Sequence, residues 1–356
     1  MPDLSVIEEK NQLSQLVLNG KADTETWFLL GKSCVLTEDF RNGIIYLLEF
    51  LRREPDPVKQ SYAHDAMGKC LLALDAEEDA LKQYNLAIAL NPTCGSALNN
   101  KALLCVARAE RLQEENAEFS ELYLDAAADC LYKALKICQL NPMFLHSAAR
   151  WYEAQIAFLM EHDRITQKQA YEDYRTAVFL YNMVDNPDNK NTAEFTATIY
   201  SNLTECYAQF GHCAYQFRDF DYALRLYDRV LQRDPAHTIV LNQVGMCCFK
   251  QQKYEQAREF FGRILSVTDE QTEHADAWLN IACAWRHERN LSEANKALTQ
   301  AEALAPADEY IIKERQDLNE ALAASALIAA PQRLFGAASS ANESLAVEAP
   351  SLHKSI

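Results

Sequence analysis

The strongest constraint on the fold is a spacing that recurs along the chain. At three places an alanine lies 12 residues before a proline, with a tyrosine or leucine four residues after the alanine. These pairs are Ala80 and Pro92, Ala223 and Pro235, and Ala294 and Pro306. Upstream, Gly211 and Gly245 are 34 residues apart, and Gly68 and Ala102 have the same separation. Because residues three and four apart share a helix face and proline ends a helix, the spacing predicts a repeated helical unit.

These residues resemble the tetratricopeptide repeat, whose unit of about 34 residues is a pair of antiparallel helices. The family pattern places Trp, Leu, Gly and Tyr on the first helix, Ala, Phe and Ala on the second, and Pro after it. Five units carry it here: Trp27, Leu30, Gly31, Leu47 and Pro55; Met67, Gly68, Leu71, Ala80, Tyr84, Ala87 and Pro92; Phe210, Gly211, Ala223, Tyr227, Val230 and Pro235; Val244, Gly245, Ala257 and Phe261; and Trp278, Ile281, Ala282, Trp285, Ala294, Leu298, Ala301 and Pro306. The resemblance implies an all-α fold, a right-handed α-α solenoid of about seven helix pairs with a C-terminal capping helix.

The regularity of the repeat varies along the chain. We expect an N-terminal helix or cap in residues 1–23, a solenoid over 24–325 and a disordered tail over 326–356, where the composition shifts to Ala, Ser and Pro. The solenoid should be regular over 24–94, irregular over 95–203, regular over 204–306 and capped over 308–325. The loop Asp185 to Asn191 is a candidate hinge or subdomain boundary. Alternatively, the tail carries a short linear motif at Arg333-Leu334-Phe335 or folds back onto the array.

Packing explains why these residue types recur. Small residues let the two helices of a pair approach, and aromatic residues fill the gap to the next pair. We therefore interpret Trp27, Tyr84, Tyr227 and Trp278 as core residues and not as a cofactor site.

Charge and composition exclude several classes of function. Lys and Arg total 34 against 51 Asp and Glu, so the net charge of −17 disfavours nucleic acid as a partner. The first residues lack the apolar core of a signal peptide, and no stretch reaches the ~18 to 20 apolar residues that span a membrane. The 11 cysteines lie in apolar segments, as expected for packing residues in a reducing compartment. We expect a cytoplasmic protein without membrane insertion.

The first helices of stacked pairs form the inner wall of a groove that suits an extended peptide or a partner helix. Asparagine is suited to such a wall because its amide both donates and accepts hydrogen bonds. An alternative is that these asparagines are merely solvated. By family position, the candidate groove residues are Lys32, Lys69, Asn99, Asn100, Asn202, Gln209, His212, Asn242, Gln243, Asn280, Arg286 and His287.

One variant of the family clamps the C-terminal carboxylate of a chaperone with Lys and Asn on one first helix, Asn on the second, and Lys and Arg on the third. Here Lys69 is followed by Asn100, but the next first helix lacks the Lys/Arg pair. A carboxylate clamp is therefore disfavoured. The acidic charge of the chain favours partners with basic or apolar segments.

The sequence contains no complete catalytic or metal-binding motif. Cys247 and Cys248 are adjacent and point about 100° apart on a helix, so they cannot share a disulfide or a metal. Cys283 and His287 have the spacing of half a zinc site, but no second pair of ligands follows. We predict no cofactor, no metal and no enzymatic activity.

The leading hypothesis is a non-enzymatic scaffold that binds a peptide or helix of a partner protein in its concave groove. The alternatives are a structural subunit of a larger complex and a chaperone or regulatory adaptor for a specific protein.

Overall fold

The computed structural model describes residues 4–184 and 193–342, with side chains for 4–184 and 195–325. This part of the chain forms sixteen α-helices and contains no strand. The all-α fold predicted from the sequence is confirmed. The chain divides into two compact units, residues 1–206 and 207–356, and the division falls inside one helix. The predicted hinge at 185–191 lies outside the described residues.

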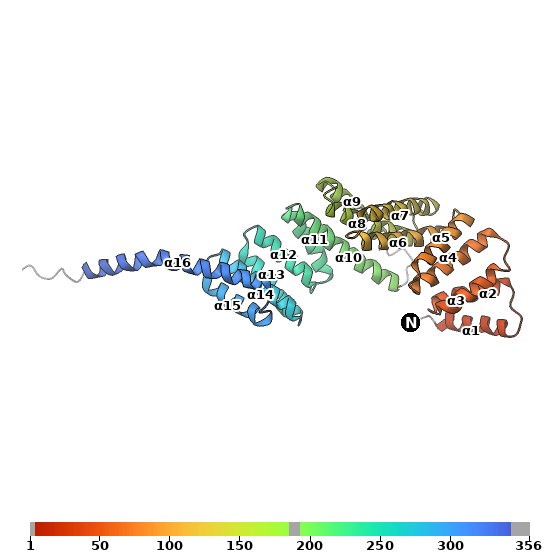
Figure 1. The fold of residues 1–356 in the computed structure, drawn as a ribbon, viewed down its shortest axis with the longest axis horizontal. Coiled ribbons are helices and arrows are strands. Elements are labelled where there is room, and N and C mark those ends of the chain that lie inside the picture. The colour runs from red at the N-terminus through yellow and green to blue at the C-terminus, as the bar shows by residue number, and fades with distance from the viewer. Residues whose placement is uncertain (1–3, 185–192, 343–356) are drawn as a thin grey trace, which may run out of the picture. The chain divides into compact units, whose positions relative to one another are not determined.

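Fourteen of the helices form seven consecutive pairs, in agreement with the predicted number. The pairs are α2 (Thr24–Leu36) with α3 (Phe40–Leu51), α4 (Pro57–Ala73) with α5 (Glu77–Leu90), α6 (Gly95–Leu112) with α7 (Ala117–Ile137), α8 (Pro142–Glu161) with α9 (Gln167–Val184), α10 (Ala193–Gln216) with α11 (Phe220–Arg233), α12 (Thr238–Lys250) with α13 (Tyr254–Val267), and α14 (Gln271–His287) with α15 (Leu291–Leu304). In the first unit, the pairs from α2/α3 to α6/α7 follow one another in chain order (Figure 1). Helices α6 to α10 have 18 to 24 residues, whereas the other paired helices have 12 to 17.

Local sequence signals set the ends of these helices. Asp56 and Asn141 each precede a proline and accept a hydrogen bond from the backbone N–H two residues later, which is a favourable helix start. Most turns inside a pair contain one residue with a left-handed backbone, φ between 52° and 64°. These residues are Glu38, Asp75, Asp163, Arg218, Gln252 and Arg289. Around Gln252, its own N–H donates to Phe249 and the next N–H donates to Cys248, as in the Schellman motif that closes helix C-termini. The turn between α6 and α7 lacks this residue and is instead capped by Asn116.

Glycines on the first helix of a pair face aromatic rings on the second helix of the same pair. We expected the rings in the gap to the next pair, and Tyr84 does also pack against Leu104 there. A Cβ added to Gly68 would overlap the ring of Tyr84, and one added to Gly211 would overlap the ring of Tyr227. Tyr84 and Tyr227 are 1% and 0% exposed, so their interpretation as core residues is confirmed. Trp27 and Trp278 are half-buried.

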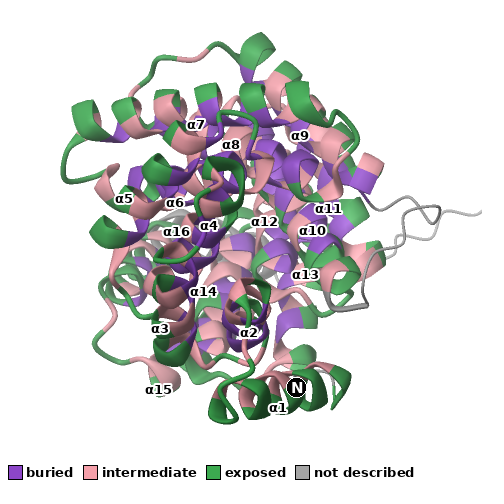
Figure 2. Cartoon of the chain, turned by 90° about the vertical axis from the view of Figure 1, so that its right-hand side faces the viewer, coloured by how far each residue is buried: buried purple, intermediate pink, exposed green. Residues whose placement is uncertain are grey.

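A helix flanks the paired helices at each end of the chain. Helix α1 (Leu4–Leu18) buries none of its residues, as its green and pink colours show in Figure 2. The Nζ of Lys10 on α1 donates a hydrogen bond to the carboxylate of Asp39 at 2.8 Å. Helix α16 (Glu309–Asn342) buries Ile311 and Leu318 in the second unit. It continues past residue 325, where we expected the cap to end. The alanine-rich sequence that follows has a high intrinsic helix propensity. Residues 343–356 lie outside the described residues.

Candidate functional site

All twelve groove candidates lie on the first helices of the pairs, namely α2, α4, α6, α10, α12 and α14. Several of them form polar bridges between successive first helices. Asn100 on α6 donates to Asp65 on α4 at 2.7 Å, and Asn280 on α14 donates to Asn242 on α12 at 2.9 Å. Because the bridges connect neighbouring pairs, they also position the side chains of the wall.

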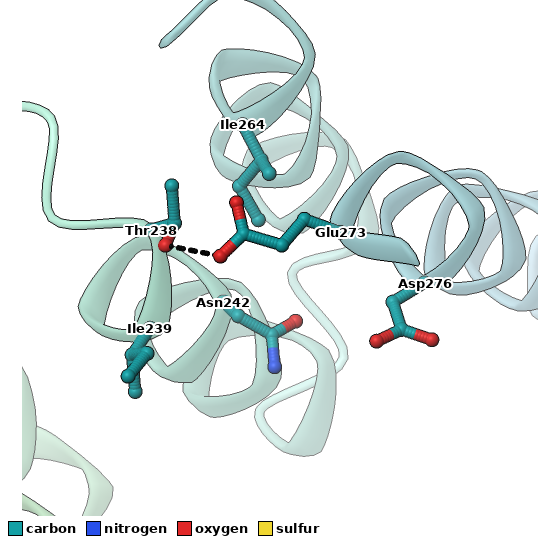
Figure 3. A pocket seen from close by; sticks show the side chains of 6 residues that line it. All are labelled: Thr238, Ile239, Asn242, Ile264, Glu273 and Asp276. Carbon is teal, nitrogen blue, oxygen red and sulfur yellow. Dashed lines mark hydrogen bonds between the residues drawn. The ribbon is translucent and has the colours of Figure 1, made fainter. Parts of the chain in front are cut away.

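In the second unit, α12, α13 and α14 border an open pocket of about 150 Å³, which we call the α12–α14 pocket (Figure 3). Pockets for small molecules usually span roughly 300–1,000 Å³, so this one has room for a single side chain. Its lining residues are Thr238, Ile239, Asn242, Ile264, Glu273 and Asp276. Thr238 donates a hydrogen bond to Glu273 at 2.8 Å, which fixes that carboxylate at the pocket wall. Ile239 is 66% exposed and offers an apolar contact at the rim.

The Asn242–Asn280 pair keeps hydrogen-bonding capacity for a ligand. The bond between them uses the Oδ1 of Asn242 and one Nδ2 hydrogen of Asn280. Within the described residues, neither the Nδ2 of Asn242 nor the Oδ1 of Asn280 has a protein partner. One amide NH2 group and one amide oxygen are therefore free to bond to a ligand, and this remains so if N and O are exchanged in both amides. This set matches the C=O and N–H of an extended peptide backbone.

Two carboxylates make the α12–α14 pocket electronegative. The pKa of Asp276 is raised, first by burial and then by the nearby Asp308 and Glu273. A cationic side chain would relieve this repulsion. Neither pocket carboxylate was predicted from the sequence, because one acidic residue on a polar helix face resembles any other in a chain with 51 of them.

Arg286 and His287 are engaged inside the second unit, contrary to their expected role in the groove. Arg286 donates to both oxygens of Glu314 on α16, at 2.6 and 2.9 Å. Glu314 is only 5% exposed, and a buried carboxylate is stabilised by such a bidentate partner. The ring of His287 lies against Phe249 and Tyr254, with centroids 5.0 and 5.7 Å apart. These contacts anchor the capping helix and the turn after α12.

The other candidates of the second unit lie outside the α12–α14 pocket. Gln209 is exposed, and Gln243 is half-buried beside the pocket residues of α12 without lining the pocket. His212 is bonded to Gln216 at 2.9 Å and stacks on Tyr215.

In the first unit, Lys69 and Asn100 contact Asp65, and Lys32 lines the same pocket as Lys69 and Asp65. Lys32 and Lys69 line a pocket of about 450 Å³ between α2 and α4, which we call the α2–α4 pocket. Asp65 is 5% exposed and receives Asn100, Ser96 at 2.8 Å and Lys69 at 3.2 Å. The two lysines and the asparagine were predicted from the sequence, but the carboxylate that binds Lys69 and Asn100 was not.

Asn99 and Asn202 do not have the environment expected of groove residues. Asn99 is 1% exposed, because it lies about 100° around α6 from Asn100 and points into the core, where its Oδ1 has no partner. Asn202 on α10 is half-buried and bonded to His146 on α8 at 2.7 Å. Its amide therefore links α10 to α8 within the first unit.

The cysteines are suited to packing. All eleven are free, and nine are buried. Burial raises the pKa of Cys247 to about 12 and that of Cys105 to about 11, so these thiols stay protonated and are poor nucleophiles or metal ligands. The described residues contain no group of three metal-ligating side chains. None of the described helices is long and apolar enough to cross a membrane.

Comparison with known proteins agrees with this architecture. A family model described as tetratricopeptide repeat matches residues 214–277. The photosystem I assembly protein Ycf3 of Rippkaea orientalis is 30% identical over 131 residues, which are 36% of this chain and 76% of that protein. The chain belongs to the tetratricopeptide repeat family. Proteins of this family generally mediate protein–protein interactions and are typically non-catalytic scaffolds.

A solved structure supports the fold. The C-terminal part of a tetratricopeptide repeat-containing protein from Cytophaga hutchinsonii aligns with a TM-score of 0.56 and 12% identity. The alignment covers 81% of this chain and 98% of that one. At this identity the match establishes the shared tetratricopeptide architecture alone.

Proposed function

We propose that this chain is a non-enzymatic scaffold that binds an extended segment of a partner protein, and that the α12–α14 pocket is one of its contacts. The observation that carries the proposal is the Asn242–Asn280 pair, which keeps one free NH2 group and one free oxygen beside a pocket for one side chain. The peptide backbone would bond to the two amides. A basic side chain of the partner would lie between Glu273 and Asp276, and an apolar one would contact Ile239.

The charge and the size of the α12–α14 pocket both support the binding of a basic side chain. The pocket carboxylates attract a Lys or Arg side chain and repel an acidic one. The volume of about 150 Å³ suits one side chain and is too small for a typical cofactor. This agrees with the basic or apolar partner segment expected from the sequence.

The test uses fluorescence anisotropy with the full chain and short labelled peptides that contain one Lys and one Leu in a neutral Ser/Ala background. We expect these peptides to bind more tightly than versions with Gln in place of Lys. Asn242→Ala should weaken binding by about 3- to 10-fold, the usual net value of one or two hydrogen bonds. Glu273→Gln combined with Asp276→Asn should remove the preference for Lys.

Two controls replace residues that precede Glu273 in the sequence and do not line the pocket. Asp269→Asn removes an exposed carboxylate just before α14, and Gln271→Ala removes an exposed amide at its start. Both should bind like the wild type. If the peptides bind the Asn242 and carboxylate variants as tightly as the wild type, the pocket is the wrong surface.

A second candidate function is an assembly adaptor, in which the array holds a partner subunit during the building of a complex. The similarity to a protein named for photosystem I assembly favours it. An adaptor should be released from the finished complex, whereas a permanent structural subunit should stay. Quantification of the chain by mass spectrometry in purified assembled and partly assembled complexes distinguishes the two.

A further inference from the structure

The α2–α4 pocket of the first unit has a different chemistry from the α12–α14 pocket. At about 450 Å³ it has room for more than one side chain. Phe28, Val35, Leu36 and Tyr62 supply its apolar lining, and Leu36 and Tyr62 are 61% and 45% exposed. When a partner covers exposed leucine and tyrosine side chains beside a pocket, the burial of their apolar surface stabilises the complex.

One positive charge in this pocket lacks an acidic partner. The ammonium of Lys69 lies 3.2 Å from the buried carboxylate of Asp65, so the two charges compensate each other. Lys32 is exposed, and its ammonium lies 5.6 Å from the centre of the Phe28 ring. No carboxylate of the described residues pairs with Lys32. The pocket therefore presents one uncompensated cation on a chain whose net charge is −17.

We propose that the α2–α4 pocket binds a partner segment in which one Glu or Asp lies beside a large apolar residue. The carboxylate pairs with Lys32, and the apolar side chain packs against Phe28, Leu36 and Tyr62. This inference rests on the proposed function, peptide binding by the array, but gives the first unit a charge preference opposite to that of the α12–α14 pocket. It also restricts to the second unit the basic preference that we expected for the whole chain.

The charge balance favours an internal acidic side chain over a C-terminal acidic residue. A C-terminal Asp or Glu brings two carboxylates, its side chain and its terminus, and both need cations when they are desolvated. Only Lys32 is available, because Asp65 already compensates Lys69 and also holds Ser96 and Asn100. One ligand carboxylate matches one free ammonium.

The experiment measures the anisotropy of labelled peptides that contain one Glu and one Phe in a neutral Ser/Ala background, with acetylated and amidated ends, against the full chain. We expect the Glu peptide to bind about 2- to 5-fold more tightly than its Gln counterpart, as for a partly exposed ion pair. Lys32→Gln should abolish this difference. Lys21→Gln, which removes another exposed lysine of the first unit, should preserve it.

Three results would overturn the inference. They are equal affinity for the Glu and Gln peptides, a preference for Glu that survives Lys32→Gln, and binding that requires a free C-terminal carboxylate.

The peptides with Lys and Leu separate this inference from the proposed function. If they bind through Asn242 while the Glu peptide does not bind, only the α2–α4 assignment fails. If neither peptide binds, both proposals fail. Because Lys32 is exposed, its replacement should leave the unfolding temperature unchanged.

Discussion

Gly245 on α12 lies directly against the ring of Phe261 on α13, so close that an added Cβ would overlap three ring carbons. Phe261 is fully buried. The same relationship joins Gly68 to Tyr84 and Gly211 to Tyr227. A ring on the second helix therefore sets the separation of the two helices. The first helix accommodates the ring because it has a glycine at the position of contact.

This contact predicts opposite effects for two glycine-to-alanine substitutions. Gly245→Ala should reduce the free energy of unfolding by about 1–3 kcal/mol, because the ring must move within a packed core. Gly262→Ala is the control, since no atom lies within 4 Å of its added Cβ. It should stabilise α13 by about 0.5–1 kcal/mol. Urea unfolding followed by circular dichroism measures both, and equal effects would contradict the packing explanation.

The left-handed residues at the turns yield a second prediction. Gln252 has a φ of 62°, a conformation that costs most residues about 1–2 kcal/mol and glycine almost nothing. Gln252→Gly should therefore raise the free energy of unfolding by about 0.5–1 kcal/mol. Gln256→Gly, four residues later inside α13, should lower it by about 1 kcal/mol. Thermal unfolding of the two variants checks the sign, and a loss of stability at Gln252 would disprove the prediction.

Asn100 and Asn280 are equivalent by repeat position, but the structure predicts different effects on stability. Asn100→Ala removes a donor at 2.7 Å from the buried carboxylate of Asp65 and should cost about 1–3 kcal/mol of folding free energy. Asn280→Ala breaks a bond between two half-buried amides and should cost about 0.5–1 kcal/mol. Chemical denaturation distinguishes the two. Equal losses would show that Asp65 does not depend on Asn100.

The repeated fold could be predicted from the sequence because its packing rule depends on local spacing. Glycine and aromatic positions such as Gly211 and Tyr227 recur at intervals that the helix pair imposes. The walls of the candidate pockets could not be predicted in the same way. Asn99 and Asn100 are neighbours in the sequence but lie about 100° apart on the helix, and one of the two is buried. The partners of these residues, such as Asp65, depend on contacts between neighbouring pairs.

A half-buried carboxylate in the first unit, that of Glu153, should make stability depend on pH. Tyr181 donates to Glu153 at 2.5 Å, and burial raises the pKa of Glu153 from its usual value of 4.5 to about 7. The hydrogen bonds from Tyr181 and Cys206 and the charge of Arg150 oppose this shift, whereas Glu205 adds to it. The folded state therefore binds a proton more readily than the unfolded state, and Glu153 contributes stability that is lost as pH rises from about 4.5 to about 7.

His146, whose ring lies 5.8 Å from that of Tyr181, has the opposite effect. Burial lowers its pKa from 6.5 to about 4, so its contribution increases as pH rises through that interval. The two contributions partly cancel in the wild type, and the informative quantity is the difference between Glu153→Gln and the wild type. Gln resembles a protonated Glu, since it stays neutral and can still accept from Tyr181.

We expect the stability of Glu153→Gln relative to the wild type to increase by up to about 3 kcal/mol between about pH 4.5 and 7 and then to level off. Urea unfolding at a series of pH values measures it. Glu172→Gln on α9 removes an exposed carboxylate and should change stability little at any pH. A constant difference between Glu153→Gln and the wild type across this range would mean that Glu153 is ionised in the folded protein throughout, with its charge compensated by Arg150 and its hydrogen-bond donors.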